Sequence, residues 1–190
     1  MSILKNKYFL IIESIKDINL KNIKKHNKFN IIYRSKIIKD KINELIYFRK
    51  ACKSKKIKFY IANNFKLCVL IKCDGIYLSS YNRSFKQLNL KKSNFDIIGS
   101  AHNLKEINFK LKQGCSYILL SKLFLVNYDK KSPFLGIVKY NKYLIDVYKK
   151  LIPLGGINHK NLAKLKSLNC VGFALMSEVK KKPAIIDRLF

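Results

Sequence analysis

The chain has 190 residues, of which 48% are hydrophobic, so general disorder is excluded and one domain with a full core is expected. No apolar run approaches the length of about 18 residues that a membrane-spanning helix needs, so we expect no membrane association. The formal net charge is +29, and only four of the 40 Lys and Arg residues are Arg.

The lysine excess has two interpretations. Lysine, asparagine and isoleucine are the residues that an A+T-rich genome favours, so the charge can reflect codon bias on an exposed surface. The alternative is a surface that binds nucleic acid or another polyanion, but nucleic-acid recognition usually relies on arginine for bidentate contacts. Nucleic acid is therefore the less favoured partner. In either case the positive field attracts anionic ligands.

Cysteine spacing and the N-terminal residues indicate the cellular compartment. The five cysteines are scattered and form no C-x-x-C pair, which argues against a zinc site or a redox motif and favours reduced cysteines packed as small hydrophobes. Residues Met1 to Lys5 are not followed by an apolar signal-peptide segment with a cleavage site, so we expect a cytoplasmic protein.

Eight short apolar runs recur along the chain and predict eight strands. Each is too short for a helix, is rich in β-branched and aromatic residues, and is continuously apolar, as expected for a parallel sheet buried on both faces. The runs are Tyr8–Ile12, Asn30–Tyr33, Lys58–Ile61, Gly75–Leu78, Asp96–Gly99, Tyr117–Leu120, Leu151–Leu154 and Val171–Leu175.

The segments between these runs mostly predict helices. Lys39–Lys50 has a loose apolar stripe, and Asn103 is a predicted N-cap, with Glu106 at the third helical position and Gly114 beyond the end near Lys112. Asn158 is expected to cap a helix that carries Leu162, Leu165 and Leu168. Repeated strand–helix alternation predicts a single compact (β/α)8 TIM barrel over residues 1–190, with abbreviated helices between strands three and five.

Two adjacent glycines, Gly155 and Gly156, follow the seventh predicted strand. Glycines at a strand end let backbone N–H groups approach a ligand closely, and a following helix N-terminus favours an anion. In (β/α)8 barrels a phosphate often binds after the seventh and eighth strands. The alternative is an ordinary tight turn between a strand and a helix.

In a barrel the functional residues lie at the carboxyl ends of the strands, and here those ends predict a basic, amide-rich rim. Arg34 and Lys36 follow the second strand, Asn63 the third and Lys122 the sixth, with no carboxylate expected before Asp129. Such a rim suits a phosphorylated ligand better than acid–base chemistry by paired carboxylates. Lys122 could hold a phosphate or carry a proton.

Several motifs, taken in order, resemble those of one family of small (β/α)8 barrels. Ile31-Ile32-Tyr33-Arg34-Ser35-Lys36 resembles V-Q-L-R-E-K, Tyr60-Ile61-Ala62-Asn63-Asn64-Phe65 resembles a segment containing I-I-N-D-R, and Ile97-Ile98-Gly99-Ser100-Ala101-His102 resembles I-I-G-x-S-x-H. Leu154-Gly155-Gly156-Ile157 and Val171-Gly172-Phe173-Ala174-Leu175-Met176-Ser177 are similar to the family's phosphate site. The family is that of thiamine-phosphate synthase and its relative, the thiazole tautomerase.

This resemblance implies a function in thiamine biosynthesis. The synthase joins hydroxymethylpyrimidine diphosphate to thiazole phosphate and releases diphosphate. By resemblance, Arg34, Lys36 and Asn63 would hold the diphosphate, and Lys122 stands near the position of a proton-carrying His in the tautomerase branch. The other substrate-binding residues implied by the resemblance are Ser100, Gly155, Gly156, Met176 and Ser177.

The resemblance also implies Mg²⁺ if the protein is a synthase, and otherwise no cofactor. The two metal-binding Asp positions of the family are Asn64 and Asn82 here, and Asn offers an oxygen without the negative charge that holds the ion.

The leading hypothesis is a synthase-like transferase acting on phosphorylated small molecules. The alternatives are a tautomerase-like or catalytically diverged paralogue, a polyanion-binding protein, and another phosphate-binding barrel. Whether the chain forms a homo-oligomer is left open by the sequence.

Overall fold

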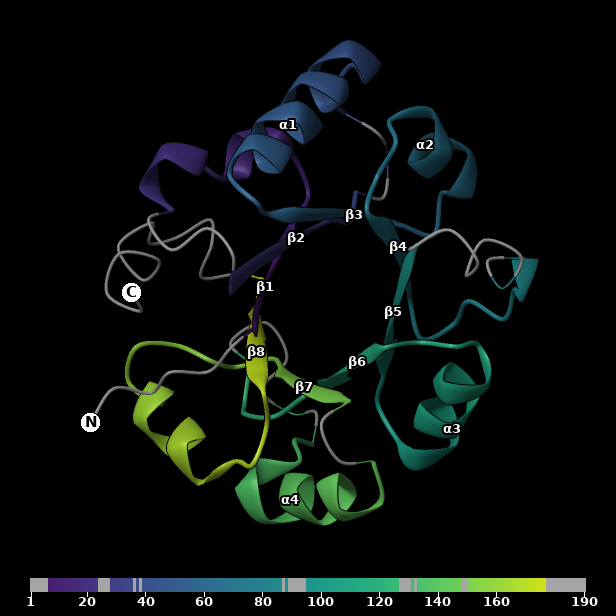
Figure 1. Ribbon diagram of the computed structural model, residues 1–190. Helices are drawn as coiled ribbons and strands as arrows, with labels where there is room; N and C mark the ends of the chain where they lie inside the picture. The colour runs from purple at the N-terminus through teal and green to yellow at the C-terminus, as the bar shows by residue number, and fades with distance from the viewer. Residues whose placement is uncertain are drawn as a thin grey trace.

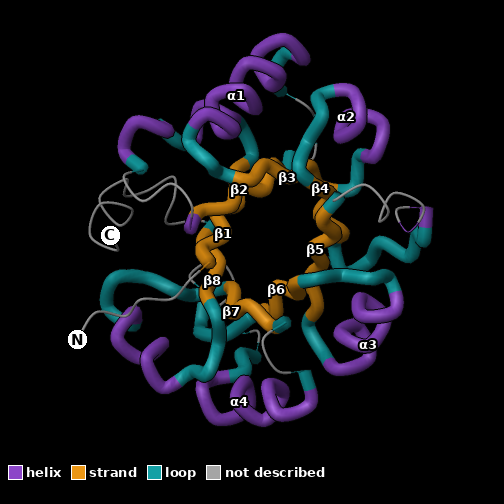
Figure 2. Tube along the Cα trace, viewed as in Figure 1, coloured by secondary structure: helices purple, strands orange, loops and turns teal. Residues whose placement is uncertain are grey.

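The eight predicted strands form a closed parallel barrel. The computed structural model describes residues 7–23, 28–35, 37, 39–86, 88, 95–126, 131, 133–147 and 150–176. Each strand pairs with the next, and β8 pairs with β1, so the ring of strands in Figures 1 and 2 is closed. The strands are β1 (Lys7–Ile12), β2 (Phe29–Tyr33), β3 (Lys58–Ala62), β4 (Gly75–Leu78), β5 (Asp96–Ala101), β6 (Tyr117–Ser121), β7 (Leu151–Leu154) and β8 (Gly172–Leu175).

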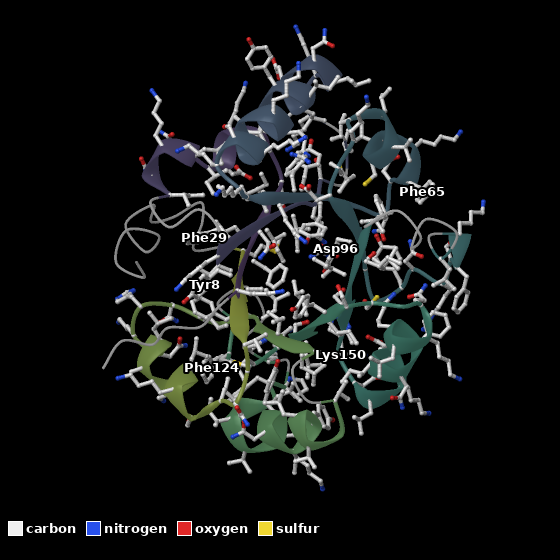
Figure 3. All side chains as sticks on the ribbon, viewed as in Figure 1. Tyr8, Phe29, Phe65, Asp96, Phe124 and Lys150 are labelled. Carbon is white, nitrogen blue, oxygen red and sulfur yellow. The ribbon has the colours of Figure 1, made fainter. Side chains whose placement is uncertain are left out.

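The strands are buried on both faces because the barrel has two cores. Side chains alternate along each strand, so in β1 Phe9 and Ile11 point to the interior cluster while Leu10 and Ile12 pack in the outer one. The interior cluster also includes Tyr60 and residues of the other strands. Figure 3 shows side chains both inside the ring of strands and between the ring and the helices. This double burial explains the continuous apolar runs.

The helices surround the ring (Figure 2), and α1 and α3 lie near the positions predicted for them. They are α1 (Ile42–Ser54), α2 (Phe65–Leu70), α3 (Leu104–Lys112) and α4 (Gly136–Asp146). The α2 helix has only six residues, in agreement with the abbreviated helices expected between strands three and five. Asn103 caps α3 as predicted, since its side-chain oxygen accepts the Glu106 amide at 2.9 Å.

The prediction of a helix capped by Asn158 was wrong. The segment after β7 forms a 3-10 helix, η5 (Leu162–Ser167), whose N-cap position is Asn161. The Asn158 side-chain oxygen instead accepts the Lys160 amide at 2.9 Å, which makes a local turn before the helix begins. Shorter 3-10 helices, η1 (Ile15–Asp17) and η2 (Leu20–Asn22), lie between β1 and β2.

Three helices end in the same way and lead directly into the next strand. A residue with positive φ follows each helix, and the residue after it donates its amide to a carbonyl in the last helical turn, which is the Schellman arrangement. The positive-φ residues are Lys56, Lys72 and Gly114, and the bonds run from Ile57 to Cys52, Cys73 to Cys68 and Cys115 to Lys110. Gly114 therefore occupies its predicted position. Four of the five cysteines are buried, as expected of small hydrophobes.

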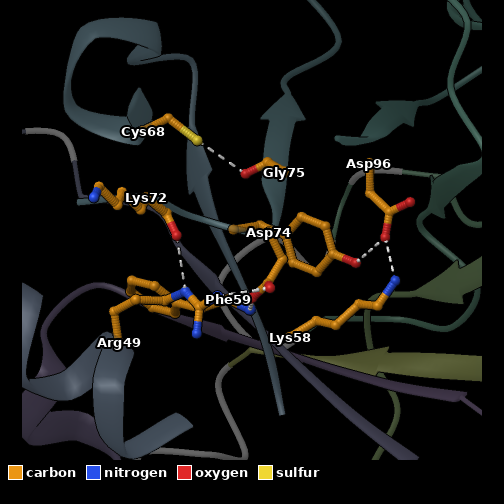
Figure 4. Close-up of polar contacts among 9 residues, drawn as sticks. Arg49, Lys58, Phe59, Cys68, Lys72, Asp74, Gly75 and Asp96 are labelled. Atoms are coloured by element: carbon orange, nitrogen blue, oxygen red, sulfur yellow. Dashed lines mark hydrogen bonds and ion pairs between the residues drawn. The ribbon is translucent and has the colours of Figure 1, made fainter. Parts of the chain in front are cut away.

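Charged residues join the amino ends of β3, β4 and β5 (Figure 4). The Arg49 guanidinium, on α1, lies 2.7 Å from the Asp74 carboxylate, which also accepts the Phe59 amide at 2.8 Å. Lys58 forms a second ion pair with Asp96 at 2.5 Å. These contacts are at the face opposite the strand ends where barrels bind ligands, so they serve stability.

Within the described residues, none of the helices has the length and hydropathy that crossing a bilayer requires.

Gly172→Ala should destabilise the barrel strongly. A Cβ at this position of β8 would lie 1.6 Å from the Lys7 carbonyl oxygen of β1, so the strand pair that closes the ring would have to separate. We expect a loss of roughly 2–4 kcal/mol in the free energy of unfolding, measured by urea denaturation. Gly136→Ala is the control, because its Cβ meets nothing within 4 Å and its positive φ alone predicts a loss of about 1 kcal/mol. Equal losses in the two variants would contradict the steric argument.

Candidate active site

A pocket of about 1100 Å³ opens over the carboxyl ends of the strands, on the side of the barrel formed by β8 and β1 to β4. Its lining combines charged, amide and apolar side chains from segments distant in the sequence. The lining residues are Glu13, Tyr33, Arg34, Ser35, Ile61, Ala62, Asn63, Asn64, Phe65, Lys66, Leu67, Tyr81, Lys86 and Met176. The pocket therefore brings together three of the predicted site residues, Arg34, Asn63 and Met176, with Asn64, one of the two metal positions that the resemblance implies.

Three cations and one carboxylate line the pocket. Arg34 follows β2, and its backbone amide donates to the Ile12 carbonyl at 2.7 Å, which holds this strand end against β1. Lys66 of α2 and Lys86 of the loop after β4 supply two further positive charges. Glu13 directly follows β1, so the expectation of a rim without carboxylates before Asp129 was wrong.

Asn63 is the centre of a hydrogen-bond network at the pocket wall. Its φ is 57°, a left-handed conformation that Asn tolerates better than most residues. The side-chain oxygen accepts the Ser79 amide and the Asn82 side-chain nitrogen, both at 3.0 Å. The side-chain nitrogen donates to Ser79 Oγ at 2.5 Å and to the Tyr81 hydroxyl at 3.2 Å. The network fixes the orientation of the Asn63 amide and ties β3 to the loop after β4.

The resemblance implies metal binding at Asn64 and Asn82, but the side-chain oxygens of both residues already accept backbone amides. Asn64 Oδ1 caps α2 by accepting the Leu67 amide at 3.0 Å, and Asn82 Oδ1 accepts the Ser84 amide at 2.9 Å. Both oxygens are neutral, whereas Mg²⁺ is usually held by carboxylates. The described residues contain no group of three or more His, Cys, Asp and Glu placed to bind a metal. This donor set does not fit a protein-held Mg²⁺ site.

The Gly155-Gly156 turn has positive φ at both residues and packs tightly against the segment after β6. A Cβ on Gly156 would lie 2.5 Å from the carbonyl oxygens of Phe124 and Leu125. The Gly155 carbonyl accepts the Phe124 amide at 3.1 Å, and the Gly156 carbonyl accepts the Asn161 side-chain nitrogen at 2.7 Å. Glycine is therefore required here by close packing, whether or not a phosphate also binds.

The other predicted residues are distributed around the same face. Ser100 lies within β5, not beyond its end, and is buried. Lys122 directly follows β6, and its Cα would lie 3.3 Å from a Cβ on Gly155. Lys36 and Ser177 lie outside the described residues.

The Tyr77 hydroxyl in the barrel interior interacts with Arg34 at the carboxyl face. Burial raises the pKa of the Tyr77 hydroxyl, while a hydrogen bond with Ser100 and the positive charge of Arg34 oppose the shift. Tyr77 therefore stays a neutral, polar group beneath the predicted anion-binding residues.

A fully buried lysine lies behind the pocket. Lys110 of α3 has no solvent exposure, and burial lowers its pKa to about 8, an effect reinforced by Arg83 and opposed by Cys115 and Glu106. Its ammonium group donates to the Asn82 carbonyl at 2.9 Å.

A closed ring of eight parallel strands with a pocket over their carboxyl ends defines the chain as a (β/α)8 barrel of the ligand-binding type. The chain belongs to the family described as thiamine monophosphate synthase, whose model matches residues 20–179. The match includes every strand from β2 to β8.

Individual relatives agree with this membership. Thiamine-phosphate synthase of Prochlorococcus marinus subsp. pastoris is 29% identical over 140 residues, which are 73% of this chain and 40% of that protein. Thiamine-phosphate synthase of Clostridioides difficile is 28% identical over 144 residues, which are 71% of this chain and 68% of that protein. The chain therefore spans about two fifths of the first relative. The solved thiamine phosphate pyrophosphorylase from Pyrococcus furiosus has a TM-score of 0.71 with 98% of both chains covered at 17% identity, which supports the fold.

Lys110→Met should change how stability depends on pH. The folded-state pKa of about 8 is lower than the value of about 10.4 for lysine in an unfolded chain. Between these values the unfolded chain binds more protons at this site, so the free energy of unfolding of the wild type should rise with pH relative to the variant. The rise is at most about 1.4 kcal/mol per pH unit, and below about pH 8 the difference should be constant.

Urea unfolding of both proteins from about pH 7 to about pH 10 measures this difference. Lys112→Met removes an exposed lysine from the same helix and controls for the loss of one positive charge. A wild-type-minus-variant difference for Lys110→Met that stays flat over the whole range would contradict the lowered pKa.

Proposed function

We propose that this chain is a thiamine-phosphate synthase-like transferase that joins hydroxymethylpyrimidine diphosphate to thiazole phosphate and releases diphosphate. The observation that carries the proposal is the family match over residues 20–179, which includes the ends of β2, β3, β4 and β8 at the pocket. The relatives named thiamine-phosphate synthase support the same reaction.

The pocket suits the leaving group of this reaction. Diphosphate departs only when its negative charge is stabilised, and positively charged side chains supply such stabilisation. Arg34, Lys66 and Lys86 line the pocket, and Asn63 is held in place beside them by its hydrogen bonds. We assign diphosphate binding to Arg34 and Lys36, with Lys66 and Lys86 as further cations. The role that the resemblance implies for Asn63 is reduced to holding the pocket wall, because both of its amide hydrogens are donated to Ser79 and Tyr81. No step is assigned to Mg²⁺, because the donor set does not fit it.

The thiazole phosphate is assigned to the turn after β7 and the residues after β8. Gly155 and Gly156 directly follow β7 at the carboxyl face, and Met176 lines the pocket from the β8 side. Ser177 completes this assignment, and Ser100 contacts substrate from β5. Lys122 lies beside Gly155, where its ammonium group can hold the phosphate or carry a proton. The two substrates would then meet across the mouth of the barrel.

A second candidate is a tautomerase-like or diverged relative that binds phosphorylated ligands without the transfer. The observation that favours it is the use of both Asn64 and Asn82 oxygens in backbone hydrogen bonds, in place of charged ligands for Mg²⁺. This candidate keeps the same pocket and predicts binding of thiazole phosphate with no thiamine phosphate formed.

Arg34→Ala should slow transfer strongly and leave the fold intact. The purified chain is incubated with both substrates and Mg²⁺, and thiamine phosphate is quantified by chromatography. We expect product from the wild type and a rate at least about 100-fold lower for the variant, because one preorganised cation at a leaving group typically contributes about 100- to 1000-fold.

Lys112→Ala is the matched control, since it removes one positive charge from the exposed side of α3. Wild-type protein that forms no product but binds thiazole phosphate would support the second candidate. Wild-type protein that does neither would refute both.

A further inference from the structure

Two neighbouring polar side chains, Lys110 of α3 and Gln113 at the C-cap of the same helix, have no solvent exposure at all. Lysine is rarely fully buried, because its charge loses hydration that only close polar partners can replace. A buried lysine with well-formed hydrogen bonds therefore marks a place where a specific arrangement is maintained. Neither residue belongs to the pocket lining.

Both side chains bind the backbone of the loop that follows β4. Lys110 Nζ donates to the Asn82 carbonyl at 2.9 Å and to Gln113 Oε1 at 2.8 Å. Gln113 Nε2 donates to the Asn82 carbonyl at 3.2 Å and to the Ser84 carbonyl at 2.6 Å. Two loop carbonyls are thus held by three hydrogen bonds from one helix face.

Strand β5 leaves room for this arrangement. A Cβ on Gly99 would lie 2.8 Å from Lys110 Cδ and 2.9 Å from Cys115 Sγ, so the lysine stem occupies the space that a side chain on β5 would fill. Aromatic contacts add to the attachment, since the Arg83 guanidinium lies 4.5 Å from the centre of the Phe109 ring and Phe85 packs on the same ring. The loop is therefore fixed to α3 at several points.

The loop that Lys110 and Gln113 hold also reaches the pocket, because Tyr81 lines it. The Asn82 side chain donates to Asn63 Oδ1 at 3.0 Å, and the neighbouring Tyr81 hydroxyl accepts from Asn63 Nδ2 at 3.2 Å. An unbroken series of hydrogen bonds therefore runs from Lys110 through Asn82 to Asn63. The series begins at Lys110 in the outer layer of helices and ends at Asn63 in the pocket wall.

We propose that Lys110 and Gln113 are positioning residues for the diphosphate-binding pocket. By holding the Asn82 and Ser84 carbonyls, they fix the loop after β4, whose Tyr81 and Lys86 line the pocket. The Tyr81 hydroxyl accepts from Asn63 Nδ2, so its own hydrogen can be donated to an anion in the pocket. Preorganised donors bind an anion more tightly than donors that must be ordered on binding. This inference rests on the proposed function, because it takes the pocket as the diphosphate site.

The test measures binding of inorganic diphosphate to the full chain by titration calorimetry, in a double-mutant cycle. The proteins are the wild type, Lys110→Met, Asn82→Ala and the double variant. Lys110→Met should weaken binding at least about fivefold, a typical lower bound for coupling between sites. In the Asn82→Ala background the same change should have a clearly smaller effect, because the loop has already lost its attachment to Asn63. The control Lys112→Met should bind like the wild type.

A purely structural role for Lys110 predicts a different pattern. The effects of the two changes would then add, or Lys110→Met would lower stability while diphosphate affinity stayed at the wild-type value, and either result would overturn the inference. Circular dichroism verifies that each variant is folded, and Gln113→Met takes the place of Lys110→Met in the cycle if that variant does not fold. Wild-type protein that binds no diphosphate would instead refute the proposed diphosphate pocket, and the inference with it.

Discussion

The hydrogen bonds between β1 and β8 close the ring, and the rest of the structure depends on that closure. All eight strands are parallel, so closing the ring brings every carboxyl end to the same face. Met176, after β8, thereby lines the same pocket as Arg34, after β2. Closure requires the strands to approach closely at Gly172, where any side chain would collide with the Lys7 carbonyl. Glycine at position 172 is therefore required for β8 to pair with β1.

The strands could be predicted from sequence because their two-sided burial makes each one a continuous apolar run. Asn103 and Gly114 were equally predictable, since capping depends on local hydrogen bonds that the residues themselves supply. The segment after β7 was mispredicted for a physical reason. Leu162, Leu165 and Leu168 recur every three residues, which suits a 3-10 helix as well as an α-helix, and Asn158 uses its side chain in a turn.

The candidate site was predictable only in part. Arg34 and Asn63 follow strands, so the barrel itself places them at the pocket, and Glu13 could have been found by extending the same reasoning to β1. Lys66 and Lys86 could not be found, because a chain so rich in lysine gives no signal for particular lysines. The burial of Lys110 was hidden for the same reason, and it depends on the missing side chain of Gly99, which is distant in sequence.

The packing of Gly156 has a mechanical consequence. Its Cα lies against the carbonyls of Phe124 and Leu125, and the Phe124 amide is bonded to the Gly155 carbonyl. The turn after β7 and the segment after β6 (Phe124 is labelled in Figure 3) are therefore joined by close packing and a hydrogen bond. A displacement of one segment has to be accommodated by the other, so a ligand that contacted one loop would also act on its neighbour.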